Sequence, residues 1–148
     1  SAVTVPVGKV SDTDKALIAS TAAALEAGIR AAKAGARVGD ISHAIEESFD
    51  GTKFAIVKVL GGHGVGRQVH EEPFISNFGI AGTGEELVPG MVLALEPIAS
   101  AGKGAVLLSP DGYTYRTKDG SRASHHEHTI LIEEGGTTVV TRRPSEKS

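Results

Sequence analysis

The sequence predicts an α+β layer fold, because two helical segments precede a succession of short strands. Apolar residues recur at helical spacing through the first third of the chain. From Phe54 onward the pattern changes to short apolar runs separated by glycine-containing turns. The 148 residues correspond to one domain, and folding at this size buries roughly 70% of the unfolded surface. We therefore expect helices packed against antiparallel strands.

Both helices have recognisable start and stop signals. Ser11 lies three residues before Asp14, which is typical of a capping box, and Gly35 is the expected end of the first helix. Asp40 is the expected cap of the second helix, which should end at Asp50-Gly51. The apolar face of the first helix is predicted at Ile18, Ala22, Leu25, Ile29 and Ala32, and that of the second at Ile41, Ala44, Ile45 and Phe49.

The remaining segments read as strands and turns. Valines alternate with other residues over 3–7, which predicts a first strand. Further strands are expected at 54–60, before a glycine-rich turn, and in the apolar run 91–98. Hairpins are predicted where 105–108 and 113–116 flank a turn at 110–112, and where 129–132 and 137–141 flank 134–136. The polar segment 142–148 is expected to be a flexible tail.

The composition excludes several classes of protein. Fifteen basic and 18 acidic residues give a net charge of −3, so no basic surface indicates direct binding of nucleic acid. Cysteine is absent, which excludes disulfides and thiolate nucleophiles. No apolar run approaches the ~18 residues of a membrane span, so we expect no membrane partner and a cytoplasmic location.

Two histidines, His63 and His70, lie seven residues apart and are separated by a glycine-rich segment. The glycines would let the backbone turn sharply and approach a ligand closely. Each histidine alone could be a solvated surface residue. Together they favour a binding or catalytic site.

Two lone carboxylates follow inside apolar segments. Glu96 interrupts the run from Val92 to Ile98, and Glu127 directly precedes another apolar run. A carboxylate at such a position is costly to bury unless it is paired, protonated or bound to a metal. The alternative is that each glutamate faces water from an edge strand. His125, His126 and His128 could suggest a metal-binding tract. Because side chains alternate along a strand, His126 and His128 should face away from the side to which Glu127 points, so we interpret Glu127 as the inward group and these histidines mostly as scaffold.

One imidazole together with carboxylates suits a divalent transition metal, and paired metals of this type occur in aminopeptidases. Such a centre lowers the pKa of a bound water. A nearby glutamate could then move a proton, and a second histidine could donate a hydrogen bond to a developing oxyanion.

Five motifs carry a resemblance to a known family. They are Gly62-His63-Gly64-Val65-Gly66-Arg67, His70-Glu71-Glu72-Pro73, Pro89-Gly90-Met91, Leu95-Glu96-Pro97 and Glu127-His128-Thr129. In this order and spacing they resemble the C-terminal half of a type I methionine aminopeptidase, and the resemblance covers essentially the whole chain.

The resemblance implies a pita-bread fold, which is a curved antiparallel sheet backed by helices in two pseudo-symmetric halves. Residues 1–148 would be the C-terminal part of one catalytic domain. It also implies a metalloprotease with two divalent ions (cobalt, manganese, iron or zinc) that removes N-terminal methionine from nascent chains in the cytoplasm. The expected partners are a peptide or nascent-chain N-terminus, the N-terminal half of the fold in cis or trans, and the ribosome.

Individual roles are also implied by the resemblance. His63, Glu96 and Glu127 match metal ligands, and Glu96 would in addition handle protons. His70 matches the catalytic histidine that contacts the scissile carbonyl. Val69 and Tyr113 fall where the family lines its methionine pocket, although larger aromatic residues are common there.

The family's other ligands belong to its N-terminal half. They are two aspartates, accompanied by a further catalytic histidine, and the second aspartate would lie immediately before Ser1. We therefore expect this chain to supply three of five metal ligands. Two alternatives remain open, namely a non-catalytic binding or regulatory module derived from the family and a proline-specific aminopeptidase relative.

Overall fold

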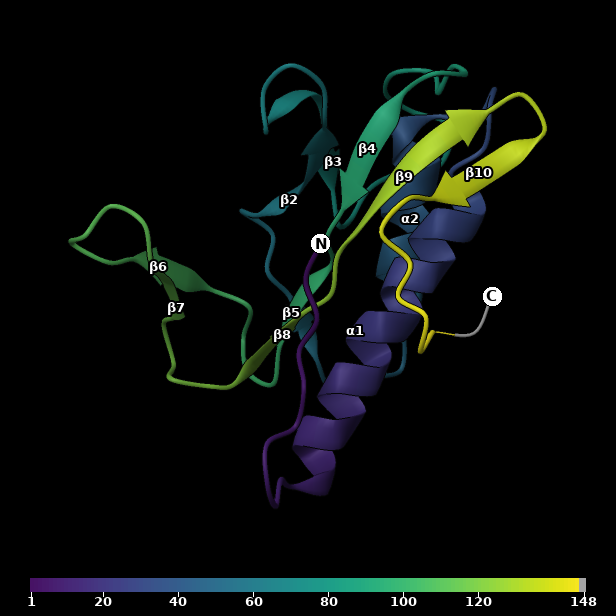
Figure 1. The fold of residues 1–148 in the computed structure, drawn as a ribbon. Helices are drawn as coiled ribbons and strands as arrows, with labels where there is room; N and C mark the ends of the chain where they lie inside the picture. The colour runs from purple at the N-terminus through teal and green to yellow at the C-terminus, as the bar shows by residue number, and fades with distance from the viewer. Residues whose placement is uncertain (147–148) are drawn as a thin grey trace.

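The computed structural model describes residues 1–146 (Figure 1). Two helices come first along the chain, and short antiparallel strands joined by loops follow them. The helices are α1 (Asp12–Ala31) and α2 (Val38–Glu47). The strands are β1 (Ala55–Ile56), β2 (Gly61–Gly64), β3 (Glu71–Ser76), β4 (Val92–Leu95), β5 (Ile98–Ser100), β6 (Val106–Leu108), β7 (Tyr115–Thr117), β8 (Ala123–His125), β9 (His128–Glu133) and β10 (Gly136–Val139). The predicted α+β class is confirmed.

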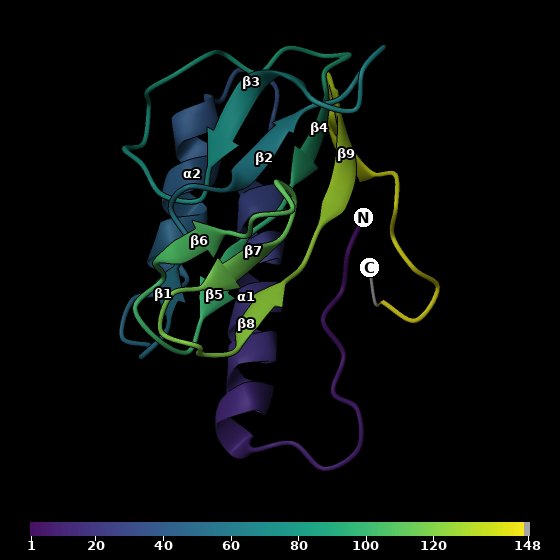
Figure 2. The same ribbon diagram turned by 90° about the vertical axis from the view of Figure 1, so that its left-hand side faces the viewer.

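The strands within 1–146 form three antiparallel groups. A five-stranded sheet has the order β10-β9-β4-β2-β3, and a three-stranded sheet has the order β1-β5-β8. Strands β6 and β7 form a separate two-stranded ribbon. Helices α1 and α2 pack side by side behind the sheets, while the β6–β7 ribbon projects from the body on another side (Figures 1 and 2).

The hydrophobic core lies between the helices and the sheets. Its largest fully buried side chains are Leu17, Ile41, Ile45, Ile75, Leu87, Leu93, Leu95, Ile130 and Ile132. The buried stripe of α1 includes Leu17 and Thr21, whereas the sequence indicated Ile18 and Ala22. Both stripes have the same helical spacing. Leu25, Ile29 and Ala32 of the predicted face are buried, so periodicity misplaced only the first two positions, by one residue each.

The start of α1 is as predicted and its end is earlier. Ser11 is the N-cap, and its hydroxyl accepts a hydrogen bond from the Asp14 backbone at 3.1 Å. The helix ends at Ala31, before Gly35. Gly35 belongs to the following turn, where its φ is +83° and its N–H donates to Leu87 O at 2.9 Å. A glycine can adopt this left-handed conformation without strain, so it marks the turn and not the helix end.

Asp40 supports α2 from the first turn and is not its cap, because the N-cap is Arg37. The Asp40 carboxylate accepts hydrogen bonds from the backbone N–H groups of Arg37 and Gly82, both at 2.7 Å. These bonds, led by the one from Arg37, hold the pKa of Asp40 below its ordinary value of 3.8. The carboxylate thus links the helix start to a distant loop.

Replacing Asp40 with alanine is expected to lower the free energy of unfolding at pH 7 by about 1 kcal/mol, as loss of a helix-start carboxylate does. Because the folded pKa is lowered, this stabilisation is complete above pH 3.8 and is lost as the pH falls through the folded pKa. Urea unfolding at pH 7 and at pH 3 would measure it. Asp12→Ala, at an exposed position on α1, is the control. An equal effect of Asp40→Ala at both pH values would contradict the assignment.

The predicted first strand over 3–7 is wrong. Among the described residues, 3–7 form no strand or bridge, and the isolated bridge between Ala2 and Glu127 lies just before them. Val3, Val5 and Val7 are 45%, 61% and 84% exposed, so their alternation reflects no buried face. The Thr4 side chain attaches this segment to the end of β8, because its hydroxyl hydrogen-bonds to both the backbone N and O of His125, at 2.9 and 3.0 Å.

The predicted glycine-rich turn is also wrong in part, because Gly61–Gly64 form strand β2 in the middle of the larger sheet. The glycines are needed for close approach. A Cβ added to Gly62 would lie 2.2 Å from Ala94 O, and one added to Gly64 would lie 2.1 Å from Glu72 O. The neighbouring strands therefore leave no room for side chains at these two positions.

The other predicted strands are present, but they begin and end at different residues from those expected. The two hairpins are confirmed as β6–β7 and β9–β10. The run 54–60 contains only the short β1, and the run 91–98 divides into β4 and β5 at Glu96 and Pro97. Residues 147–148 of the predicted tail lie outside the described residues. Within 142–146, Arg142 forms an ion pair with Glu26 of α1.

Candidate metal centre

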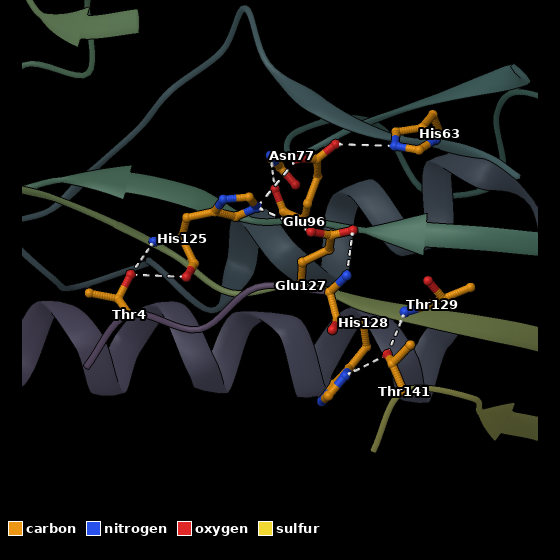
Figure 3. A network of polar contacts seen from close by, with 10 residues as sticks. Thr4, His63, Asn77, Glu96, His125, Glu127, His128, Thr129 and Thr141 are labelled. Atoms are coloured by element: carbon orange, nitrogen blue, oxygen red, sulfur yellow. Dashed lines mark hydrogen bonds and ion pairs between the residues drawn. The ribbon is translucent and has the colours of Figure 1, made fainter. Parts of the chain in front are cut away.

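The site forms where two neighbouring strands are interrupted at the same level. Strand β4 pairs with β9 and ends at Leu95 opposite His128, while β5 pairs with β8 and begins at Ile98 opposite His125. The residues between these pairs include Glu96 on one strand and Glu127 on the other. The interruption therefore sets both predicted carboxylates side by side where the larger sheet meets the smaller one (Figure 3).

Glu96 is the centre of the contacts. Its Oε1 lies 3.7 Å from Nε2 of His63, and its Oε2 lies 3.3 Å from Nε2 of His125. The side chain is only 17% exposed, so water compensates its charge poorly. Within 1–146 its ion-pair partners are these two imidazoles, and no lysine or arginine takes part.

The tautomer of His63 follows from its position on β2. Its Nδ1 lies 2.9 Å from Gly64 O, and a carbonyl oxygen can only accept. Nδ1 therefore carries a proton and donates to this carbonyl, which leaves Nε2 as the ring nitrogen that faces Glu96. Nε2 and the Glu96 carboxylate, 3.7 Å apart, are both groups that can bind a divalent metal. This arrangement is typical of a metal-ligating histidine whose other nitrogen donates to the backbone.

Glu127 and His128 point in opposite directions, as the strand alternation predicted (Figure 3). Glu127 Oε2 lies 4.0 Å from Nε2 of His125, on the side of Glu96. His128 is 1% exposed, and its ring contacts Thr141 Oγ1 at 3.0 Å and Glu146 Oε2 at 3.3 Å. Burial lowers the pKa of His128, which favours its neutral form. This histidine therefore packs and holds the C-terminal segment.

Two residues of the site were missed from the sequence. His125 faces Glu96, and its position two residues before Glu127 already indicated a shared face. Asn77 is 1% exposed and donates through Nδ2 to Glu96 O at 3.1 Å and to Leu60 O at 3.4 Å. It thereby fixes the backbone at the interruption, and no local sequence pattern reveals such a long-range role.

A cavity of about 670 Å³ opens beside these residues. His63, His70 and Glu96 contribute polar groups to its wall, and the apolar part of the wall includes Phe74 and Tyr115. The rings of His63 and His70 meet edge to face with centroids 4.4 Å apart. One imidazole thus faces the carboxylates while the other extends along the cavity, where a bound molecule would lie.

Val69 and Tyr113 do not line this cavity. They are 74% and 90% exposed, and Tyr115 occupies the wall where the sequence indicated Tyr113. Contact of Val69 or Tyr113 with a substrate stays a prediction.

The donor types fit a divalent transition metal, although the side chains are not yet gathered around one point. Within 1–146, no three histidine, aspartate or glutamate side chains form a ready-made ligand group. The contacts run in a chain from His63 through Glu96 and His125 to Glu127. One imidazole and two carboxylates are donor types that bind such a cation, and side-chain rotation would be needed to bring them around one ion. In the same part of the chain, neither helix combines the length and apolarity that a bilayer crossing requires.

Comparison with known proteins gives consistent results. The chain is 44% identical to methionine aminopeptidase 1 of Bacillus subtilis (strain 168) over 142 residues, which are 96% of this chain and 57% of the relative. It matches the crystal structure of methionine aminopeptidase from Thermotoga maritima with a TM-score of 0.91 and 45% identity, covering 95% of this chain and 57% of that one. The chain thus spans just over half the length of these relatives.

A more distant structure shares the fold. The Xaa-Pro dipeptidase from Bacillus anthracis matches with a TM-score of 0.70 at 22% identity, over 97% of this chain and 35% of that one. Together with the Thermotoga structure it confirms the predicted pita-bread architecture. The family model of the M24 metallopeptidases matches residues 1–134, and the chain therefore belongs to metallopeptidase family M24.

Proposed function

We propose that this chain supplies three metal ligands and part of the substrate cavity of a type I methionine aminopeptidase. The observation that carries the proposal is the placement of His63, whose Nδ1 contacts Gly64 O at 2.9 Å while its Nε2 faces the largely buried carboxylate of Glu96 at 3.7 Å. His63, Glu96 and Glu127 would hold the metal. Two divalent ions, of cobalt, manganese, iron or zinc, match this mixture of nitrogen and oxygen donors.

The cations, when bound, would supply a water of lowered pKa near neutral pH. Each of this chain's residues then has a separate task. Glu96 would accept a proton and return it to the leaving amine. His70, on the cavity wall, would donate a hydrogen bond to the scissile carbonyl oxygen. The apolar wall at Phe74 and Tyr115 would receive the methionine side chain and exclude water.

The start of the chain supports the same proposal. Ala2 pairs with Glu127 through two backbone hydrogen bonds of 3.3 and 2.9 Å. Ser1 N lies 3.4 Å from Glu127 Oε1, so the backbone at residues 1–2 lies beside this carboxylate. We propose that the remaining ligands, two aspartates, reach the site from the N-terminal half of the fold. The substrate would be the N-terminus of a peptide or nascent chain in the cytoplasm, within reach of the ribosome.

Peptide assays test the proposal directly. The chain would be incubated with Co²⁺ or Mn²⁺ and the N-terminal half of the Bacillus subtilis relative, and then given Met-Ala-Ser or Ala-Pro-Ala. Release of methionine from the first peptide alone is the expected result. Cleavage of Ala-Pro-Ala alone would favour a proline-specific enzyme. Turnover of neither peptide, with metal bound, would favour a non-catalytic module.

A further inference from the structure

His125 is held in place from two sides by its backbone. Strand β8 pairs with β5, where His125 lies opposite Ile98. On its other side, the Thr4 hydroxyl accepts from His125 N at 2.9 Å and donates to His125 O at 3.0 Å. A side chain on so constrained a backbone has few alternative positions, which is what a residue that orients its neighbours requires.

The Nε2 atom of His125 lies between the two carboxylates. It is 3.3 Å from Glu96 Oε2 and 4.0 Å from Glu127 Oε2 (Figure 3). The ring is 36% exposed, yet Nε2 itself is buried and has no aligned hydrogen-bond partner within 1–146. Burying a polar nitrogen without a hydrogen bond costs free energy. Rotation of the ring or of the Glu96 side chain could align a hydrogen bond between them and reduce that cost.

The surroundings decide which role Nε2 takes. Both oxygens in reach belong to carboxylates, which accept hydrogen bonds and do not donate them when ionised. Nε2 must therefore act as the donor. Donation to Oε2 of Glu96 leaves Oε1 turned toward His63, and it also keeps the two negative carboxylates apart.

We propose that His125 is a positioning residue of the metal centre, which orients Glu96 toward His63 and separates it from Glu127. It contacts neither substrate nor reacting atoms. Partners of this kind fix the orientation of ligating carboxylates, and their loss typically reduces metal affinity about 10- to 100-fold. The inference deepens the proposed function, because it rests on Glu96 and Glu127 being ligands.

Two variants of His125 test the inference in the 148-residue chain. His125→Leu removes the donor, and His125→Gln keeps a donor at similar reach. His43→Leu is the matched control, since His43 also faces a glutamate, Glu47, at 3.9 Å but lies on the exposed side of α2. Calorimetric titration with Co²⁺ is expected to show an affinity at least about 10-fold lower for His125→Leu. His125→Gln and His43→Leu should stay within about threefold of the unaltered chain.

A second measurement needs no metal. In chain labelled with ¹³C at glutamate carboxyls, the Glu96 resonance at fixed pH is expected to move in His125→Leu and to stay in His43→Leu. Thermal unfolding would show that each variant is folded. An unmoved Glu96 resonance in folded His125→Leu overturns the inference, as does unchanged affinity for Co²⁺.

The spectrum of bound Co²⁺ separates positioning from direct ligation. A positioning role leaves the visible Co²⁺ bands of His125→Gln close to those of the unaltered chain. Loss of band intensity and of affinity in both His125→Leu and His125→Gln would mean direct ligation and would overturn the inference. The proposed function fails in a different experiment: if Met-Ala-Ser is not cleaved while the effects of the His125 variants persist, the proposed function is wrong and the positioning role of His125 stands.

Discussion

Replacing His63 with alanine is expected to weaken Co²⁺ binding by more than about 100-fold, because loss of a ligand exceeds the 10- to 100-fold cost of losing an outer partner. The hydrogen bond between Nδ1 and Gly64 O holds the ring of His63 with Nε2 facing Glu96. Isothermal titration of the folded variant measures the loss.

The neighbouring histidine provides an internal comparison. His70→Ala is expected to retain Co²⁺ affinity within a few-fold, since His70 lines the cavity and stacks edge to face on His63. Its effect should appear in kcat of the complemented enzyme, where removal of one oxyanion donor typically costs about 10²–10³-fold. Equal loss of metal by His63→Ala and His70→Ala would refute the separate roles of the two rings.

Replacing Gly62 with alanine is expected to lower the free energy of unfolding by about 3 kcal/mol and the melting temperature by roughly 10 °C. The added Cβ would lie 2.2 Å from the backbone oxygen of Ala94. Because this atom belongs to the main chain of β4, it cannot move aside as a flexible side chain can. The strands must separate, and β2 carries His63 with it.

Gly135→Ala is the control for that variant. Gly135 has no neighbouring heavy atom within 4 Å of an added Cβ and is not in the left-handed region. Its replacement should change stability by no more than about 0.5 kcal/mol. Calorimetric melting of both variants provides the comparison. A Gly62→Ala protein as stable as Gly135→Ala would show that β2 and β4 are not packed as closely as described.

Local signals predicted much of this fold. The Ser11 cap, the helical spacing of apolar residues and the glycine turns of the two hairpins each act within a few residues, so a single sequence reveals them. The glycines of β2 could not be assigned in this way. A glycine required by a neighbouring strand looks the same in sequence as one required by a turn, and only the distance to Ala94 O separates the two cases.

The site shows the same division. Imidazole and carboxylate chemistry indicated His63, Glu96 and Glu127, and the structure brings the first two to 3.7 Å. The alternation argument that separated Glu127 from His128 also places His125 on the side of Glu127, so interpreting His125 as scaffold was wrong. Asn77 had no such signal, because its task depends on two carbonyls that meet only after folding.

The interruptions between β4 and β5 and between β8 and β9 lie at the same level, so the two sheets meet along a seam. Glu96 and Glu127 lie at this seam, and His63 lies on β2 of the larger sheet. Any substitution that tilts one sheet against the other will change ligand spacing without altering a ligand. Buried residues next to the seam, such as Leu95 and Ala99, are therefore positions where packing and metal affinity should vary together. A substitution at the seam that is made to change stability is therefore expected to change metal affinity as well.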